Sequence, residues 1–320
     1  MTTRTLTATR PGPVALSVDL PAGDIRVVTD PDRTLAEVTV TAHGDDPAVH
    51  DAVRDAALRW DESTGALTVR VRPLAGGVTI VGGTQTVIGN RAATIVQSFG
   101  DIPAGVTVNG AVISGDGIVN LGGRVVVNGV EITGGAVGGG RVEITALLPE
   151  GSSVAALTRS APLECSGEFA AVDFTSTSGD LSVGGVGTLR AQTTSGDVSA
   201  VVVDGAAVVR SVSGDVYFGR ADDVTAVSTS GDVTVIDFAG RAEVSTVSGD
   251  VRVRAAEGGT ISARSVSGDI TVTATGTALA EGLRVDATSR TGRVTTPTDN
   301  PYGTVSAGRA RRPRRTAGGA

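Results

Sequence analysis

The sequence predicts an all-β protein whose C-terminal half is a single-stranded parallel β-helix, a form of solenoid. The first observation is a Ser-Gly-Asp triplet that recurs six times between Ser178 and Asp269, at spacings of 17, 18, 17, 18 and 19 residues. The second is the alternation of apolar and polar residues on both sides of each triplet. The third is a composition with 45 glycines and only 2% aromatic residues, which favours short strands and tight turns. Repeats of this length bury their apolar side chains by stacking, and by analogy with strand crossovers the array should be right-handed.

Residues 1–74 are predicted to form an N-terminal, β-rich capping unit that contains one helix. Asp46 is a suitable N-cap and Pro47 suits the first turn, so the helix is expected at about residues 47–60. The apolar face of this helix would carry Val49, Val53, Ala56, Ala57 and Trp60. Strands are expected around the helix at residues 14–20, 25–29, 35–41 and 67–71.

Residues 75–150 are Gly-rich with short Val and Ile runs, for which the sequence predicts irregular β structure. Two of these runs close in Val-Asn-Gly, ending at Gly110 and Gly129. Asn-Gly favours hairpin turns, so both a hairpin and irregular coils are open for this segment. Residues 141–148 then lead into the repeats.

Residues 151–296 form the repeat array, in which each coil is expected to supply two inward-facing strands around a glycine corner. Apolar residues stand seven and five positions before each glycine, and two and four positions after it. A seventh, degenerate corner at residues 289–294 keeps Gly292 after a 24-residue step, which predicts an extra loop around residues 278–282. The six complete corners have their glycines at Gly179, Gly196, Gly214, Gly231, Gly249 and Gly268.

A hydroxyl residue also recurs at every corner, three positions before the glycine and with the same inward parity. We expect this column to hydrogen-bond along itself and to the corner backbone. The glycines are expected to adopt positive φ, and Asp or Ser side chains to satisfy nearby turn amides. The hydroxyl column consists of Ser176, Thr193, Ser211, Ser228, Thr246 and Ser265.

The composition excludes several chemistries. All 27 basic residues are arginine, so no lysine is present for a Walker A motif, a Schiff base or pyridoxal phosphate. A net charge of −7 and a pI near 4.9 argue against general polyanion binding. The single cysteine, Cys165, has no partner for a disulfide, which suits a reducing compartment.

Neither end of the chain looks like a membrane or export element. Residues 1–20 lack the apolar run of an export signal, and no run approaches the roughly 20 apolar residues of a membrane-spanning helix. We therefore expect a cytoplasmic protein. Residues 297–320, rich in Pro, Gly and Arg, are expected to be a disordered basic tail that contacts nucleic acid or acidic lipid only weakly. Its clustered arginines are Arg309, Arg311, Arg312, Arg314 and Arg315.

The strongest candidate site is the column of aspartates that follow the corner glycines. Rungs about 5 Å apart would place these carboxylates in a row that could bind cations. Hydrogen bonds at the corner would offset the modest repulsion without any metal, so we favour a structural role. His43 and His50 lack a third ligand, and Cys165 lacks a nearby base, so no catalytic, cofactor-binding or metal-binding residue is predicted. The column consists of Asp180, Asp197, Asp215, Asp232, Asp250 and Asp269.

The Ser-Gly-Asp-(Leu/Val/Ile) corners and the approach at Leu147-Leu148-Pro149-Glu150-Gly151 resemble a bacterial β-strand-repeat family of unknown function related to putative adhesins. The resemblance covers residues 151–296 well and the N-terminal strands loosely. It implies a right-handed β-helix and, in some relatives, surface or envelope-stress roles.

The sequence therefore favours a non-enzymatic, adhesin-like binding or scaffold module without a cofactor, whose partner is a protein or a cell-envelope component. A subunit that polymerises end to end into a filament is the alternative, although Arg293 at the last corner and the basic tail would obstruct that end. A carbohydrate-cleaving β-helix enzyme is less favoured. Catalysis needs one unique constellation of residues, whereas these aspartates recur in every coil.

Overall fold

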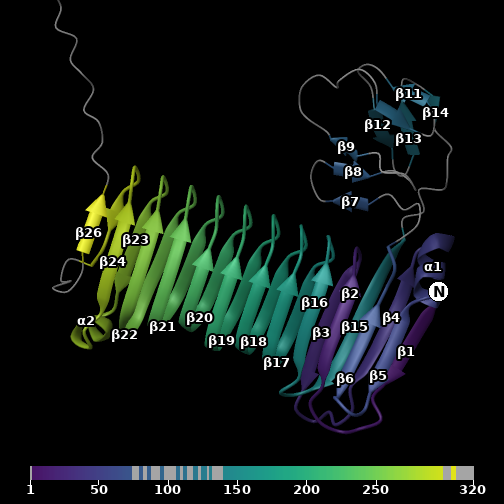
Figure 1. Ribbon diagram of the computed structural model, residues 1–320, viewed down its shortest axis with the longest axis horizontal. Coiled ribbons are helices and arrows are strands. Elements are labelled where there is room, and N and C mark those ends of the chain that lie inside the picture. The colour runs from purple at the N-terminus through teal and green to yellow at the C-terminus, as the bar shows by residue number, and fades with distance from the viewer. Residues whose placement is uncertain are drawn as a thin grey trace, which may run out of the picture. The chain divides into compact units, whose positions relative to one another are not determined.

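The computed structural model describes residues 2–73 and 140–297, together with short strands between residues 79 and 131 and at Thr304–Ala307 (Figure 1). The chain divides into two compact units. Unit 1 comprises Met1–Gly167 and Phe174–Asp180, and unit 2 comprises Glu168–Asp173 and Leu181–Ala320.

Unit 1 is built on a mixed β-sheet with one helix. Its strands are β1 (Thr3–Thr7), β2 (Ala15–Leu20), β3 (Asp24–Asp30), β4 (Glu37–His43), β5 (Ala57–Asp61), β6 (Ala66–Arg70), β15 (Arg141–Pro149), β16 (Ser153–Thr158) and the first part of β17 (Leu163–Thr175). β2 pairs in parallel with β6 and β16, whereas β15 pairs in parallel with β3 and antiparallel with β4. β1 is antiparallel to β4, and β5 is antiparallel to β6. The four strands predicted around the helix are confirmed as β2, β3, β4 and β6, and β1 lies outside every predicted strand.

The helix α1 (Pro47–Arg54) is shorter than the helix predicted over residues 47–60. Asp46 caps it as expected, because its side chain accepts a hydrogen bond from a first-turn N–H at 2.9 Å. The prediction is wrong beyond α1, where the chain enters β5 and Trp60 pairs with Leu67 of β6. The apolar residues after α1 suit a helix face and a strand equally, and the antiparallel hairpin with β6 decides between them.

The segment between β6 and β15 is described only as short strands. They are β7 (Thr79–Val81), β8 (Gln85–Val87), β9 (Thr94–Val96), β10 (Val106–Val108), β11 (Ala111–Ile113), β12 (Ile118–Leu121), β13 (Arg124–Val127) and β14 (Val130–Glu131). β10 and β11 pair antiparallel with only Asn109 and Gly110 between them, and β13 and β14 with only Asn128 and Gly129 between them. These registers are those of hairpins. The rest of the predicted Gly-rich segment up to residue 139 lies outside the described residues.

Unit 2 is a stack of parallel coils. Its elements are the middle of β17, β18 (Leu181–Gln192), β19 (Val198–Arg210), β20 (Val216–Val227), β21 (Val233–Thr246), β22 (Val251–Ser265), β23 (Ile270–Ala274), α2 (Gly276–Ala280), β24 (Arg284–Ser289), β25 (Val294–Thr295) and β26 (Thr304–Ala307). From β18 to β22 each strand pairs in parallel with the next, so that each residue lies beside its equivalent one coil later, as Val216 lies beside Val233. The solenoid predicted for the repeats is observed in this unit (Figure 1).

Each coil from β18 to β22 contains one long strand where two were predicted. Both inward-facing halves are present, but pairing continues between them through a register shift, as at Val186/Leu189. Differences in coil length are taken up at these shifts, in the turn opposite the glycine corner. Glycines keep the backbones close enough to pair there, since a Cβ on Gly205 would lie only 2.5 Å from the carbonyl oxygen of Gly187.

The inward residues of unit 2 form a narrow apolar core. Phe218 and Phe238 are fully buried, and valines, isoleucines, leucines and alanines fill most of the other inward positions. Each fully buried Val contributes roughly 1.5–3 kcal/mol relative to an exposed one. The core therefore gains its stability from many small side chains.

The 24-residue step before the last corner contains the short helix α2 where a loop was predicted. Thr275 caps this helix, accepting a hydrogen bond from the Ala278 N–H at 3.1 Å, and Ala278 itself is buried. The first part of β22 pairs with β23, which precedes this helix, and the last part of β22 pairs with β24, which follows it. The helix is therefore an insertion within one coil, and the parallel pairing resumes after it. In the predicted disordered tail, β26 pairs in parallel with β24, and the other residues from 298 onward lie outside the described part.

Candidate functional site

The recurring hydroxyls are buried and hold the corner backbone. In each coil the glycine N–H donates to the hydroxyl three residues earlier, as Gly231 does to Ser228 at 2.9 Å. The same bond, at 2.8 to 3.0 Å, recurs at the other five complete corners and at the degenerate seventh. Bonding along the column was also expected, but within the described ranges only Thr158 donates to a column member, Ser176, at 2.9 Å. Each of the seven oxygens accepts an N–H from its own corner.

The corner glycines are required for a reason other than the one the sequence suggested. Positive φ was expected, and this is wrong, because none of the corner glycines has it. The cause is stacking. A Cβ on Gly214 would lie 1.9 Å from the carbonyl oxygen of Gly196 in the preceding coil, and the equivalent distances for Gly231, Gly249 and Gly268 are 2.0, 2.0 and 1.9 Å. No side chain fits between two backbones at that separation.

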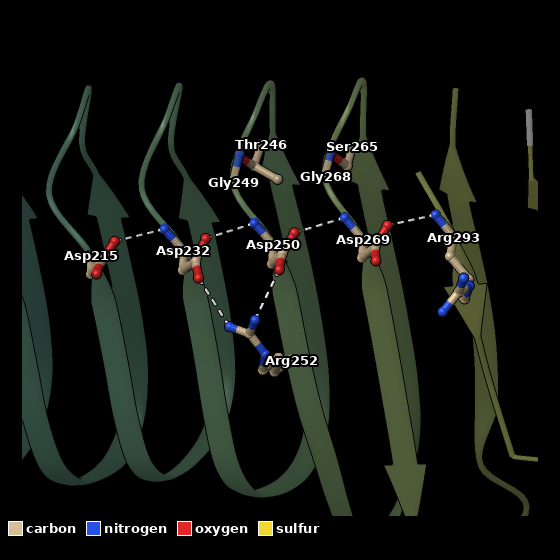
Figure 2. Close-up of polar contacts among 10 residues, drawn as sticks. All are labelled: Asp215, Asp232, Thr246, Gly249, Asp250, Arg252, Ser265, Gly268, Asp269 and Arg293. Carbon is tan, nitrogen blue, oxygen red and sulfur yellow. Dashed lines mark hydrogen bonds and ion pairs between the residues drawn. The ribbon is translucent and has the colours of Figure 1, made fainter. Parts of the chain in front are cut away.

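The aspartates that follow the glycines form a ladder from coil to coil. The N–H of Asp250 donates to Oδ1 of Asp232 at 2.8 Å, so the side chain of one coil binds the backbone of the next (Figure 2). The expectation that these side chains satisfy turn amides is met, although the amide belongs to the neighbouring coil. Further steps of the ladder, at 2.7 to 2.8 Å, are Asp215 to Asp197, Asp232 to Asp215, Asp269 to Asp250 and Arg293 to Asp269.

One arginine spans two rungs of this ladder. Arg252 on β22 donates from Nη1 to Oδ2 of Asp232 at 3.0 Å and from Nη2 to Oδ2 of Asp250 at 2.8 Å (Figure 2). The hydrogen bond that Arg252 donates to Asp232 and the negative charges of nearby aspartates raise the pKa of Arg252 above its ordinary value. This contact could not be predicted from the sequence, because it depends on the register between β21 and β22.

The ladder therefore uses its carboxylates as backbone acceptors and as arginine partners. No group of three or more His, Cys, Asp or Glu side chains with metal-binding geometry occurs in the part of the chain that the structure describes. The structural role favoured for this column agrees with the ladder bonds.

The two histidines make separate contacts in unit 1. His43 Nε2 lies 2.5 Å from Oε2 of Glu143, whereas His50 contacts Thr2 Oγ1 at 2.8 Å through Nδ1 and the Gly44 carbonyl at 2.9 Å through Nε2. Neither was predicted to be a ligand.

Glu143 belongs to a row of charged side chains that was not predicted from the sequence. Arg26 on β3 lies 3.6 Å from Glu143 on β15 and 3.1 Å from Glu164 on β17. These residues are far apart in sequence, so only the pairing of β3 with β15 and β17 brings them together.

Cys165 is a small core residue, as predicted. It is 3% exposed on β17, and burial raises the pKa of its thiol to about 12. A thiol in this state is not a nucleophile at neutral pH.

Unit 2 also carries an outward row of three valines and one threonine, which we call the corner ridge and define as Val212, Thr229, Val247 and Val266. These residues stand two positions before the corner glycines of four successive coils. The N–H groups of Ser230, Ser248 and Ser267 donate to the carbonyls of the ridge residues one coil earlier, at 2.8 to 2.9 Å. The three valines are 43 to 46% exposed. No role was predicted for this position from the sequence.

The fold and the repeated corner define a β-solenoid repeat protein. The Toastrack DUF4097 family profile matches residues 15–311, and the chain belongs to that family. The family name describes no activity. No curated protein matches the sequence significantly.

Two solved structures are similar over nearly the whole chain. One, named a putative adhesin from Parabacteroides distasonis, is 10% identical with a TM-score of 0.35, and the match covers 95% of this chain and 96% of that one. The other, a putative adhesin from Parabacteroides merdae, is 8% identical with a TM-score of 0.27, covering 96% and 97%. Among the residues that the structure describes, no helix has the length and apolarity needed to cross a membrane.

Proposed function

We propose that this protein is a non-enzymatic scaffold that binds another protein through the outer faces of its coils. The observation that carries the proposal is the corner ridge, where Val212, Val247 and Val266 stand outward on a rigid stack at 43 to 46% exposure. A row of exposed apolar side chains on an ordered surface is a feature of protein interaction sites. The recurring polar groups of the corner, by contrast, are engaged in holding the coils together.

We further infer that the array is right-handed, that unit 1 caps one end of it, and that the protein works in the cytoplasm. The preference of parallel crossovers for one hand supports the first inference. The antiparallel strands β1 and β5 of unit 1 support the second, because such strands end a parallel array. The single cysteine, Cys165, which is a free thiol, supports the third, because disulfides are rare in reducing compartments.

The test places charges on the ridge. The variant V212K/V247K/V266K should fold normally, because these side chains are outward, but should lose specific partners that wild type retains from a lysate of the source cells. The control V208K/T225K/S262K places three lysines at outward positions four residues further from the corner. Identical sets of retained proteins for wild type and the ridge variant would rule out the ridge as the binding surface.

A filament former is the second candidate, because a stack of parallel strands can add a further strand at an open edge. Size-exclusion chromatography with light scattering across protein concentration, with and without calcium, separates the two candidates. A monomer of constant mass supports the scaffold. Mass that grows with concentration identifies end-to-end assembly.

A further inference from the structure

One outward face of unit 2 carries an exposed aromatic side chain beside a position that has no side chain. Tyr217 and Gly219 stand two residues apart on β20, on the same face of the strand, and Tyr217 is 44% exposed. The registers of β19 and β21 with β20 place Val201 and Ile236 beside Gly219, one coil before it and one coil after it. These two side chains are 60% and 40% exposed. We call the space over Gly219, between Val201 and Ile236, the Gly219 gap.

The stack itself keeps the Gly219 gap free of a side chain. A Cβ on Gly219 would collide with the carbonyl oxygen of Val201 in the preceding coil, so only glycine fits there. The gap can be entered only from outside the sheet. Tyrosine is one of the residues enriched at the centre of protein interfaces. One face of β20 therefore holds both an exposed aromatic side chain and an apolar gap that could receive one.

The two features match each other in a second copy of the chain. A two-fold axis perpendicular to the face, midway between Tyr217 and Gly219, exchanges the two positions. Each Tyr217 then lies over the Gly219 gap of the other copy, in the space of about 10 Å between two stacked sheets. Both copies use the same surface in such a contact, so it closes at two chains.

The charges on β20 are complementary about the same axis. Asp215 stands two residues before Tyr217 and Arg220 directly follows Gly219, and both are exposed. The axis brings Asp215 of one copy to within one residue of Arg220 of the other, about 3.3 Å along the strand. Among the residues that the structure describes, neither Asp215 nor Arg220 has an ion-pair partner. The contact therefore contains two reciprocal arginine–aspartate pairs.

We propose that two copies of this chain form a face-to-face dimer in which Tyr217 of each copy enters the Gly219 gap of the other. The five coils from β18 to β22, at about 4.8 Å per coil and about 16 Å across, offer about 400 Å² per copy. This area is small for a specific interface, so the dimer should be reversible. The corner ridge lies outside the contact, and the proposed function does not depend on it.

The first experiment measures the mass of the full-length protein by light scattering across protein concentration. Wild type should rise from one chain to two and stop there. D215R and R220D each place like charges opposite one another, and each should raise the dissociation constant of the dimer at least tenfold. An equimolar mixture of the two variants should form the dimer again, because both of its contacts then join an arginine to an aspartate.

Circular dichroism checks that both variants are folded, since D215R also removes one bond of the aspartate ladder. The control E243R makes the same kind of charge change in the second half of β21, beyond its register shift, and should dimerise like wild type. A wild-type mass of one chain at every concentration, or a mixture as dissociated as its two components, would overturn the proposal. Growth beyond two chains would assign the association to the ends of the stack and would also overturn it.

A disulfide provides a second measurement that leaves the ladder unchanged. The axis places Val201 of one copy opposite Thr234 of the other, whereas within one chain the two lie two coils apart, too far for a disulfide. Oxidised V201C/T234C should therefore run as a covalent dimer on a non-reducing gel. The control V201C/T225C, whose second cysteine lies beyond the register shift of β20, should stay a single chain. A single chain for V201C/T234C contradicts the proposed axis, and Cys165 takes no part because it is buried.

Discussion

The N–H of Asp250 donates to Oδ1 of Asp232 at 2.8 Å, so an aspartate side chain of one coil holds the main chain of the next (Figure 2). The bond is repeated along unit 2 up to Arg293, whose N–H donates to Asp269. Arg293 has no carboxylate, so its side chain cannot accept an N–H from a following coil. The glycine and the aspartate of each Ser-Gly-Asp triplet thus have three distinct structural roles. The glycine permits close stacking, its N–H closes the corner, and the aspartate joins the coils.

The ladder bond should be measurable at Asp215, which pairs with no arginine among the residues that the structure describes. Asp215→Ala removes the acceptor of the Asp232 N–H and should lower the free energy of unfolding by about 0.5–1.5 kcal/mol, whereas Asp215→Asn keeps an acceptor and should cost less. Urea unfolding monitored by circular dichroism gives both values. If the two variants are equally destabilised, the charge matters and the amide acceptor does not.

Stacking at the corner should make Gly231 intolerant of any side chain. Gly231→Ala would place a Cβ 2.0 Å from the carbonyl oxygen of Gly214, and the resulting backbone shift should cost about 3 kcal/mol or more. Gly276→Ala is the control, because a Cβ there meets nothing within 4 Å and alanine favours the helix. Thermal melting compares them, and a Gly231→Ala protein that melts like wild type contradicts the close approach.

A charge in the core should unfold the array. Val251 is fully buried, so Val251→Asp places an unpaired carboxylate among apolar side chains, at a cost of about 4 kcal/mol or more, and Val233→Asp should behave alike. Val201→Asp introduces the same charge at a side chain that is 60% exposed and should change stability by less than about 0.5 kcal/mol. Retention of native circular dichroism and melting in the Val251 variant would show that the core lies elsewhere.

Cys165 should be protected until the protein unfolds. Burial raises the pKa of its thiol from 9.0 to about 12, so iodoacetamide at pH 8 should label it only in denaturant. The folded state holds this proton more tightly than the unfolded state. The stability that this provides is therefore fully present below about pH 9 and is lost as the pH rises from about 9 towards 12. Cys165→Ala should show a shallower loss of stability over this range, and rapid labelling of the native protein would refute the buried position.

Local patterns were sufficient to predict most of the scaffold. The period of the repeats, the inward positions of each coil and the bond from each corner glycine to its hydroxyl depend on residues within one coil, as for Gly231 and Ser228. The strands around α1 could also be predicted, because the alternation of apolar and polar residues is a local signal. The end of α1 was not, since Trp60 belongs to a hairpin that forms only with Leu67.

The sequence by itself therefore determined the coil, and the tertiary structure decided what happens between coils. The need for glycine at Gly231 arises from a carbonyl oxygen one coil away, and the carboxylate of Asp232 meets an amide 18 residues later. The pairing of Arg252 with two rungs and the grouping of Arg26 with Glu143 likewise depend on strand register. Spacing along a chain shows which residues are equivalent, but a distance between atoms of different coils is set only when the stack closes.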